Sequence, residues 1–180
     1  MKLLPSIRGH GDLVNLSDAQ RSVLCGEIRD FIVAHLAKTG GHLASNLGAV
    51  ELTVGIHRVF DAPKDDILFD VGHQCYVHKM LTGRRDRFDT LRQFGGISGF
   101  LRPSESAYDS AVSGHASSSV SVALGMARAK KLAGKDSCTV CVIGDGALTG
   151  GLAYEALNDA AVSREPMVII LNDNEMSIGE

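Results

Sequence analysis

Apolar residues recur at helical spacing in four segments of the chain. The first segment begins at a capping box, residues 17–20 (SDAQ), in which the Ser17 and Gln20 side chains can each bond a backbone N–H group. It stops at the glycine pair at 40–41, and the third segment stops before Gly134, a residue type that suits the position after a helix. The pattern therefore predicts helices from residue 17 to the glycines at 40–41 and over residues 49–60, 117–133 and 149–161.

Three short apolar runs, residues 67–71, 139–143 and 167–171, are typical of buried strands. Strand, helix and strand follow one another from 139 to 171, which predicts a βαβ unit with a right-handed crossover. The fold class is therefore α/β, a parallel sheet with helices on both faces. The polar stretch from 82 to 113 is expected to be mostly loop, with one short helix near Thr90.

Polar and small residues follow each predicted strand. Residues 72–74 (GHQ) follow the first strand, residues 144–151 (GDGALTGG) the second and residues 172–176 (NDNEM) the third. In a parallel α/β sheet, ligands bind beyond the carboxyl ends of the strands. We therefore expect these three segments to lie at one edge of the sheet and to contain the binding site.

Asp145 stands between Gly144 and Gly146, just before a predicted helix. Glycines let backbone N–H groups reach an anion, and a helix N-terminus adds a favourable field. A lone carboxylate would repel a phosphate there unless it held a divalent cation that bridges to the phosphate, as Mg²⁺ commonly does. Asn174, after the neighbouring strand, offers a neutral oxygen. Each piece alone is more often a tight turn or a solvated loop, but together they predict a metal–diphosphate site.

The sequence does not match the motifs of other common nucleotide-binding and metal-binding sites. A dinucleotide fingerprint needs glycine where Thr149 stands, and the Gly-Lys-Ser/Thr triplet of a P-loop does not occur. Cys138 and Cys141 have a CxxC spacing, but residues three apart on a strand face opposite ways. They are therefore expected to be buried free thiols in a reducing compartment.

Composition narrows the class of protein further. The chain has 180 residues, of which 44% are hydrophobic, and a formal net charge of −3, which gives no electrostatic case for nucleic acid or an anionic membrane. The N-terminus is too short in apolar residues for a signal peptide, and no run approaches the length of a membrane span. These features predict a soluble, cytoplasmic protein.

The histidines divide into two groups by their setting. His42 follows two glycines in a stretch of small residues between two predicted helices, His73 follows a strand, and His115 follows a glycine near a helix start. A flexible backbone beside a ligand edge suits a functional imidazole. The remaining four are expected on the surface or on helix faces, without a role: His10, His35, His57 and His78.

The run GDGALTGGLAYEALNDA, followed by ILNDNEMSI, is similar to the thiamine-diphosphate motif. Four further blocks, GGHLASNLGAVELT, LFDVGHQCYVHKMLTGRRD, GGISGF and GHASSSVSVALGMA, resemble the 1-deoxy-D-xylulose-5-phosphate synthase family. Transketolase and the E1 component of pyruvate dehydrogenase share the Gly-Asp-Gly motif but not the GHQCYVHKMLTGRRD block. The resemblance runs from about residue 40 to residue 178 and implies a diphosphate-binding domain of the transketolase type.

The resemblance also implies a role for each matching residue. Mg²⁺ would be held by the side chains of Asp145 and Asn174 and by the backbone carbonyl of Met176. His42 would face the substrate and assist proton transfer, with His73 orienting and stabilising. Thiamine diphosphate would be contacted by the residues of the matching motifs: His73, Gly114, His115, Ala116, Gly144, Gly146, Ala147 and Asn174.

The reaction implied by the resemblance joins pyruvate to D-glyceraldehyde 3-phosphate, giving 1-deoxy-D-xylulose 5-phosphate and CO₂ for isoprenoid, thiamine and pyridoxal biosynthesis. By analogy with the family, a homodimer is expected. Residues 1–180 would form part of an N-terminal diphosphate-binding domain, without the pyrimidine-binding and C-terminal domains, so the isolated chain is expected to be inactive. The alternative is a non-catalytic cofactor-binding fragment or one subunit of a split transketolase-like enzyme.

Overall fold

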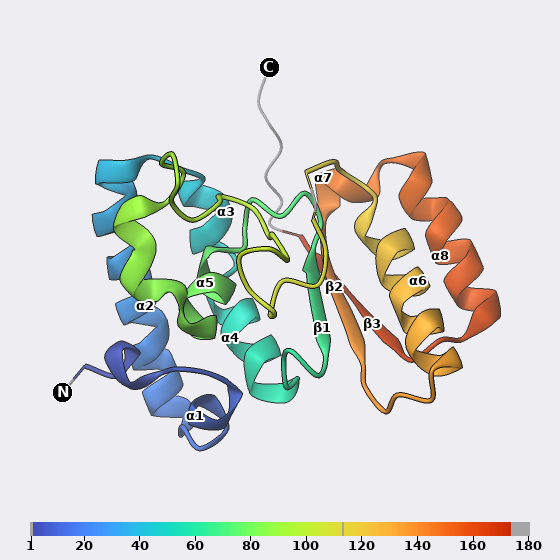
Figure 1. The fold of residues 1–180 in the computed structure, drawn as a ribbon, viewed down its shortest axis with the longest axis horizontal. Coiled ribbons are helices and arrows are strands. Elements are labelled where there is room, and N and C mark those ends of the chain that lie inside the picture. The colour runs from blue at the N-terminus through green and yellow to red at the C-terminus, as the bar shows by residue number, and fades with distance from the viewer. Residues whose placement is uncertain (1, 113, 174–180) are drawn as a thin grey trace. The chain divides into compact units, whose positions relative to one another are not determined.

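The computed structural model describes residues 2–112 and 114–173, and the chain divides into two compact units (Figure 1). The first unit comprises Met1–Ala62 and His73–Gly99, and the second comprises Pro63–Gly72 and Phe100–Glu180. The two predicted histidines at 42 and 73 therefore belong to the first unit, and the predicted strand-end residues at 144–147 belong to the second.

The first unit is helical. Its longest element, α2 (Asp18–Thr39), starts at the predicted capping box, in which Ser17 accepts from the Gln20 N–H group and the Gln20 side chain accepts from Ser17. The buried side chains of α2 include Leu24, Ile28 and Ile32, which recur at helical spacing. The other helices of this unit are α1 (His10–Val14), α3 (Leu43–Leu47), α4 (Val50–Val59) and α5 (Tyr76–Lys79), with 3-10 helices at Leu4–Ser6 and Arg85–Thr90 and a π-helical turn at Met80–Arg84.

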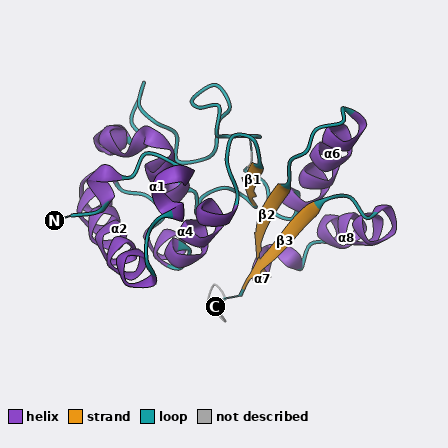
Figure 2. Ribbon diagram, turned by 90° about the horizontal axis from the view of Figure 1, so that it is seen from below, coloured by secondary structure: helices purple, strands orange, loops and turns teal. Residues whose placement is uncertain are grey.

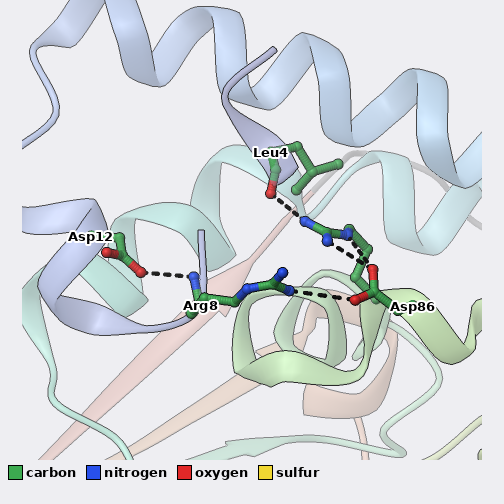
Figure 3. A network of polar contacts seen from close by, with 5 residues as sticks. Leu4, Arg8, Asp12 and Asp86 are labelled. Carbon is green, nitrogen blue, oxygen red and sulfur yellow. Dashed lines mark hydrogen bonds and ion pairs between the residues drawn. The ribbon is translucent and has the colours of Figure 1, made fainter. Parts of the chain in front are cut away.

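Polar contacts tie the N-terminal segment to the 3-10 helix at Arg85–Thr90 (Figure 3). The Arg8 guanidinium lies 3.5 Å from the Asp86 carboxylate, and the Arg8 N–H group donates to Asp12. The Arg85 guanidinium donates to the Leu4 carbonyl at 2.6 Å and also contacts Asp86. Exposed ion pairs of this kind contribute little stability, so the main effect of the network is to fix the path of the segment.

The second unit contains a three-stranded parallel sheet in the order β1 (Asp66–Phe69), β2 (Thr139–Gly144) and β3 (Met167–Asn172). Helices α6 (Ser119–Leu132) and α8 (Gly151–Ser163) cover one face of this sheet (Figure 2). The helices contribute small side chains to this contact, Ala123 from α6 and Ala153 and Ala156 from α8. The other buried residues of the core on this face are Leu68, Val120, Cys141 and Ile143. Residues on both faces of the central strand β2 are buried. The predicted α/β class with a parallel sheet is confirmed.

The structure differs from the sequence expectations in its short elements. Helix α3 begins directly after His42, where the sequence predicted only a stretch between helices, and α5 follows Cys75. Strand β1 ends at Phe69, two residues earlier than predicted, and Val71 has a positive φ of 60°. The described part of the polar stretch, residues 82–112, is mostly loop, as expected, apart from the end of the π-helical turn and the 3-10 helix that ends at Thr90.

Two sequence expectations concern the cysteines, which were expected to be buried free thiols, and the lack of a membrane span. All four cysteines are free, and burial raises the pKa of the Cys141 thiol to about 12, whereas Cys138 is only half-buried. In the described parts of the chain, residues 2–112 and 114–173, no helix is long and apolar enough to span a membrane.

Candidate functional site

The carboxyl ends of β2 and β3 lie side by side, as the sequence predicted. Gly144 is the register partner of Asn172, and Asp145 begins the short helix α7 (Asp145–Leu148) immediately after β2. Asn174 and Met176, the other two expected metal ligands, lie outside the described residues. The described part of the predicted edge therefore brings Asp145 to the end of the central strand, next to the end of β3.

The turn around Asp145 is accessible. Asp145 is half-buried, Gly146 is exposed, and a Cβ atom added at Gly146 would meet no protein atom within 4 Å. A carboxylate oxygen and an uncovered glycine backbone are groups that suit a Mg²⁺-bound diphosphate. Among the described residues, no group of three or more His, Cys, Asp or Glu side chains is arranged to hold a metal ion. Of the side chains expected to hold the metal, Asp145 is therefore the one that the described residues include, and its setting fits part of such a site.

A buried carboxylate at the end of β1 holds the loop that carries the predicted residues 114–116. Asp70 is 1% exposed and accepts hydrogen bonds from the backbone N–H groups of Ser117, at 2.9 Å, and Ser119, at 3.0 Å. Gly114, His115 and Ala116 are exposed and directly precede Ser117. Asp70 therefore fixes the point at which this exposed loop enters helix α6.

Ser117 connects this loop to the Asp145 turn. Its hydroxyl donates to the backbone carbonyl of Ala147 at 2.6 Å, and its φ of 72° is in the left-handed region that non-glycine residues rarely adopt. A Cβ atom at Gly150 would lie 2.1 Å from the Ser117 hydroxyl oxygen, so glycine is required there for the two segments to approach. The second unit thus brings together two groups of predicted site residues, 114–116 and 144–147.

A second non-glycine residue with a positive φ near these segments is Val71, which follows Asp70. A β-branched residue in this conformation is strained, and such strain is concentrated at functional sites in proteins. Asp70, Val71 and Ser117 were not selected from the sequence. One signal was present, because Asp70 is a single acid in an otherwise apolar strand run, and a buried acid is rare unless it has partners.

In the first unit, the two predicted catalytic histidines lie together. The ring centroids of His42 and His73 are 5.3 Å apart, and the ring planes are inclined at 61° to one another. Burial is the main cause that lowers the pKa of His42, and the Arg92 cation lowers it further. At neutral pH the His42 imidazole is therefore uncharged, the form that can accept a proton in general base catalysis.

His57 and His78 were expected on the surface or on helix faces; they do lie on helices α4 and α5, but neither is at the surface. His57 is 2% exposed and His78 is fully buried, and the His57 Nε2 atom lies 2.9 Å from the His78 Nδ1 atom. Burial lowers the pKa of His57 well below its usual value, with His78, His10 and Arg84 acting in the same direction. The pair spans α4 and α5, so periodicity within either helix could not show that the two residues meet.

The sequence is similar to one family of known proteins over almost its whole length. The family model described as 1-deoxy-D-xylulose-5-phosphate synthase matches residues 4–180. The 1-deoxy-D-xylulose-5-phosphate synthase of Clostridium kluyveri is 55% identical over 178 residues, and that of Pelotomaculum thermopropionicum is 56% identical over 179. Each match covers 99% of this chain but 28% of the relative, so the chain spans about 28% of the length of these relatives.

Solved structures support the fold. The transketolase from Leishmania mexicana has a TM-score of 0.76 and the transketolase from Campylobacter jejuni a TM-score of 0.77, each at 21% identity. The matches cover 85% of this chain and 27% and 28% of those chains, respectively. At this identity the likeness shows a shared fold of the transketolase type.

Proposed function

Because the chain belongs to the 1-deoxy-D-xylulose-5-phosphate synthase family, we propose that it forms the diphosphate-binding part of an enzyme of that activity. The complete enzyme would join pyruvate to D-glyceraldehyde 3-phosphate and release CO₂ and 1-deoxy-D-xylulose 5-phosphate. The observation that carries this proposal is the accessible Asp145 turn at the end of β2, joined through Ser117 to the exposed loop 114–116. The product class would serve isoprenoid, thiamine and pyridoxal biosynthesis.

Thiamine diphosphate and Mg²⁺ are the proposed cofactors. Asp145, Asn174 and the Met176 carbonyl would hold the metal, while the backbone around Gly144, Gly146 and Ala147 would lie against the diphosphate. The loop of Gly114, His115 and Ala116, together with His73, would complete the contacts. When bound, thiamine diphosphate supplies the electron sink that decarboxylation and carbon–carbon bond formation require.

The chain's own contribution to the chemistry would be orientation and proton transfer. An uncharged His42 can accept or, after protonation, return a proton at the oxygen of a reacting carbonyl. His73, whose ring lies 5.3 Å from that of His42, would orient the reacting groups. We further propose a homodimeric assembly in the cytoplasm, in keeping with the family.

A chimera tests the proposed function directly. The matching 178 residues of the Clostridium kluyveri relative would be replaced by this chain, which is 55% identical to them. The chimera should form 1-deoxy-D-xylulose 5-phosphate from pyruvate and D-glyceraldehyde 3-phosphate, and only with Mg²⁺ and thiamine diphosphate. The isolated 180-residue chain should form none. A folded chimera without activity, beside an active unmodified relative, would contradict the proposal.

A further inference from the structure

Three residues of the first unit form a closed ring of hydrogen bonds. The Asn46 side-chain amide donates to the His42 carbonyl at 2.7 Å, and its oxygen accepts from the Tyr76 N–H group at 2.8 Å. The ring is closed by the Tyr76 hydroxyl, which lies 3.4 Å from the His42 backbone nitrogen and 3.4 Å from its Nδ1 atom. The two Asn46 hydrogen bonds are shorter than the two contacts of the Tyr76 hydroxyl, so Asn46 makes the stronger hydrogen bonds of the ring.

Asn46 also holds the second histidine. Its amide nitrogen donates to the His73 carbonyl at 2.8 Å as well as to His42. Asn46 is fully buried, and its amide thus uses both donor hydrogens and its oxygen on three residues, of which His42 is four positions away and His73 and Tyr76 are 27 and 30 positions away. One side chain therefore fixes the backbone of His42, of His73 and of Tyr76 at once.

Glycine at position 41 makes room for the Tyr76 hydroxyl. Gly41 has a φ of 139°, and a Cβ atom there would lie 2.9 Å from the Tyr76 hydroxyl oxygen. A side chain at 41 would be strained by this backbone conformation and would also push the hydroxyl away from His42. The local sequence GGH thus has a physical reason that involves Tyr76, a residue the sequence analysis did not select.

We infer that Asn46 and Tyr76 are positioning residues that hold the His42 imidazole beside His73, with its Nδ1 atom accepting a hydrogen bond from the Tyr76 hydroxyl. The importance of this arrangement for catalysis rests on the proposed function, whereas the arrangement itself does not.

The charge states of the two rings agree with this inferred assignment of the hydrogens. Burial raises the pKa of Tyr76, so its hydroxyl keeps its hydrogen at neutral pH, and the lowered pKa of His42 keeps that imidazole uncharged. The hydroxyl oxygen accepts from the backbone N–H group of His42, and its own hydrogen is available for donation to the Nδ1 atom of the ring. A neutral imidazole that accepts at Nδ1 carries its hydrogen on Nε2. In the inferred arrangement, Tyr76 therefore favours this one tautomer of His42.

Nitrogen NMR on the ¹⁵N-histidine-labelled 180-residue chain tests the inference without any cofactor. The His42 signals of the native chain should show an unprotonated Nδ1 and a protonated Nε2, and nuclear Overhauser contacts should connect the His42 and His73 rings. Tyr76→Phe should raise the pKa of His42, because it removes a hydrogen bond to the neutral form. A His42 that is protonated at Nδ1, or a pKa that Tyr76→Phe leaves unchanged, would overturn the inference.

Asn46→Ala tests the role of the Asn46 hydrogen bonds to His42, His73 and Tyr76. It should remove the contacts between the two histidine rings and also raise the pKa of His42, while Asn15→Ala should change neither. Asn15 is a suitable control because its exposed amide donates only to Gly11, one turn earlier on α1. Retained ring contacts in a folded Asn46→Ala variant would overturn the role of Asn46, and Tyr76→Phe decides the tautomer if Asn46→Ala does not fold. All of these readouts are spectroscopic, so their outcome does not depend on whether the proposed synthase activity is correct.

Discussion

The buried carboxylate of Asp70 accepts hydrogen bonds from the backbone of Ser117, 47 residues further along the chain, at 2.9 Å. Through this contact the end of β1 determines where the loop 114–116 enters helix α6. Ser117 in turn bonds Ala147, so a single strand-end acid indirectly places the turn that carries Asp145. The candidate diphosphate site is therefore supported by a residue that would not itself be expected to touch a ligand.

Asp70→Asn should destabilise the second unit. The substituted amide can accept with its oxygen only, so one of the Ser117 and Ser119 N–H groups loses its acceptor inside the protein. An unsatisfied buried donor costs about 1–3 kcal/mol, and this loss should appear in the free energy of unfolding measured with urea. Asp136→Asn is the matched control, because Asp136 is exposed in the same unit. Equal values for the two variants would show that the Asp70 contacts contribute nothing.

Alanine substitutions at two adjacent glycines, Gly150 and Gly151, test the close approach of Ser117 to the start of α8. A Cβ atom at Gly150 would lie 2.1 Å from the Ser117 hydroxyl oxygen, whereas one at Gly151 would meet nothing within 4 Å. Gly150→Ala should therefore lower the free energy of unfolding by about 1–3 kcal/mol through overpacking. Gly151→Ala should be neutral or slightly stabilising, because alanine favours the helix that starts there. Similar effects of both substitutions on thermal unfolding would argue against the close approach of Ser117.

The sequence predicted the long elements well because their patterns are local. The capping box at Ser17 and the apolar spacing behind it specify α2, and the β-branched runs specify β2 and β3 to within a residue. The helices α3 and α5 have five and four residues, too few to show a period, so they were missed.

Some residues of the candidate site could likewise be predicted from local sequence, and others could not. Asp145 and its glycines could be selected from their position after a strand. Asn46 and Ser117 could not, since their roles come from contacts with residues about 30 positions away. The partner of the buried His57 is likewise His78, which lies 21 residues further on.

Acid should weaken the first unit through the His57–His78 contact. Burial lowers the pKa of His57 well below its ordinary value of 6.5, so between these two values the unfolded chain binds a proton that the folded chain does not. The free energy of unfolding should therefore fall as the pH drops below about 6.5, by up to about 1.4 kcal/mol per pH unit for one such group. Urea unfolding at pH 7.5, 6.5 and 5.5 measures the slope.

His57→Gln should reduce that slope, whereas His115→Gln, at an exposed histidine, should not. A stability that stays constant over this range in the native chain would mean that His57 is protonated in the folded state.

His42→Ala in the chimera should lower kcat by about 10²–10⁴-fold, the usual cost of removing a general acid or base. The Kd for thiamine diphosphate should change far less, because the ring would act on reacting atoms. His35→Ala serves as a control, since His35 is a partly buried histidine on α2 without a proposed catalytic role. A fall in melting temperature large enough to account for the lost activity would make His42 a structural residue instead.

The most direct measurement is the affinity of the chimera for thiamine diphosphate, by isothermal titration calorimetry with and without Mg²⁺. The native site should bind in a Mg²⁺-dependent manner. Asp145→Ala should abolish that binding without lowering the melting temperature, because Asp145 is half-buried at the sheet edge and Mg²⁺ tolerates a missing ligand poorly. Asp136→Ala, at an exposed acid of the same unit, should bind normally. Unchanged Mg²⁺-dependent binding by Asp145→Ala would contradict the proposed metal–diphosphate site.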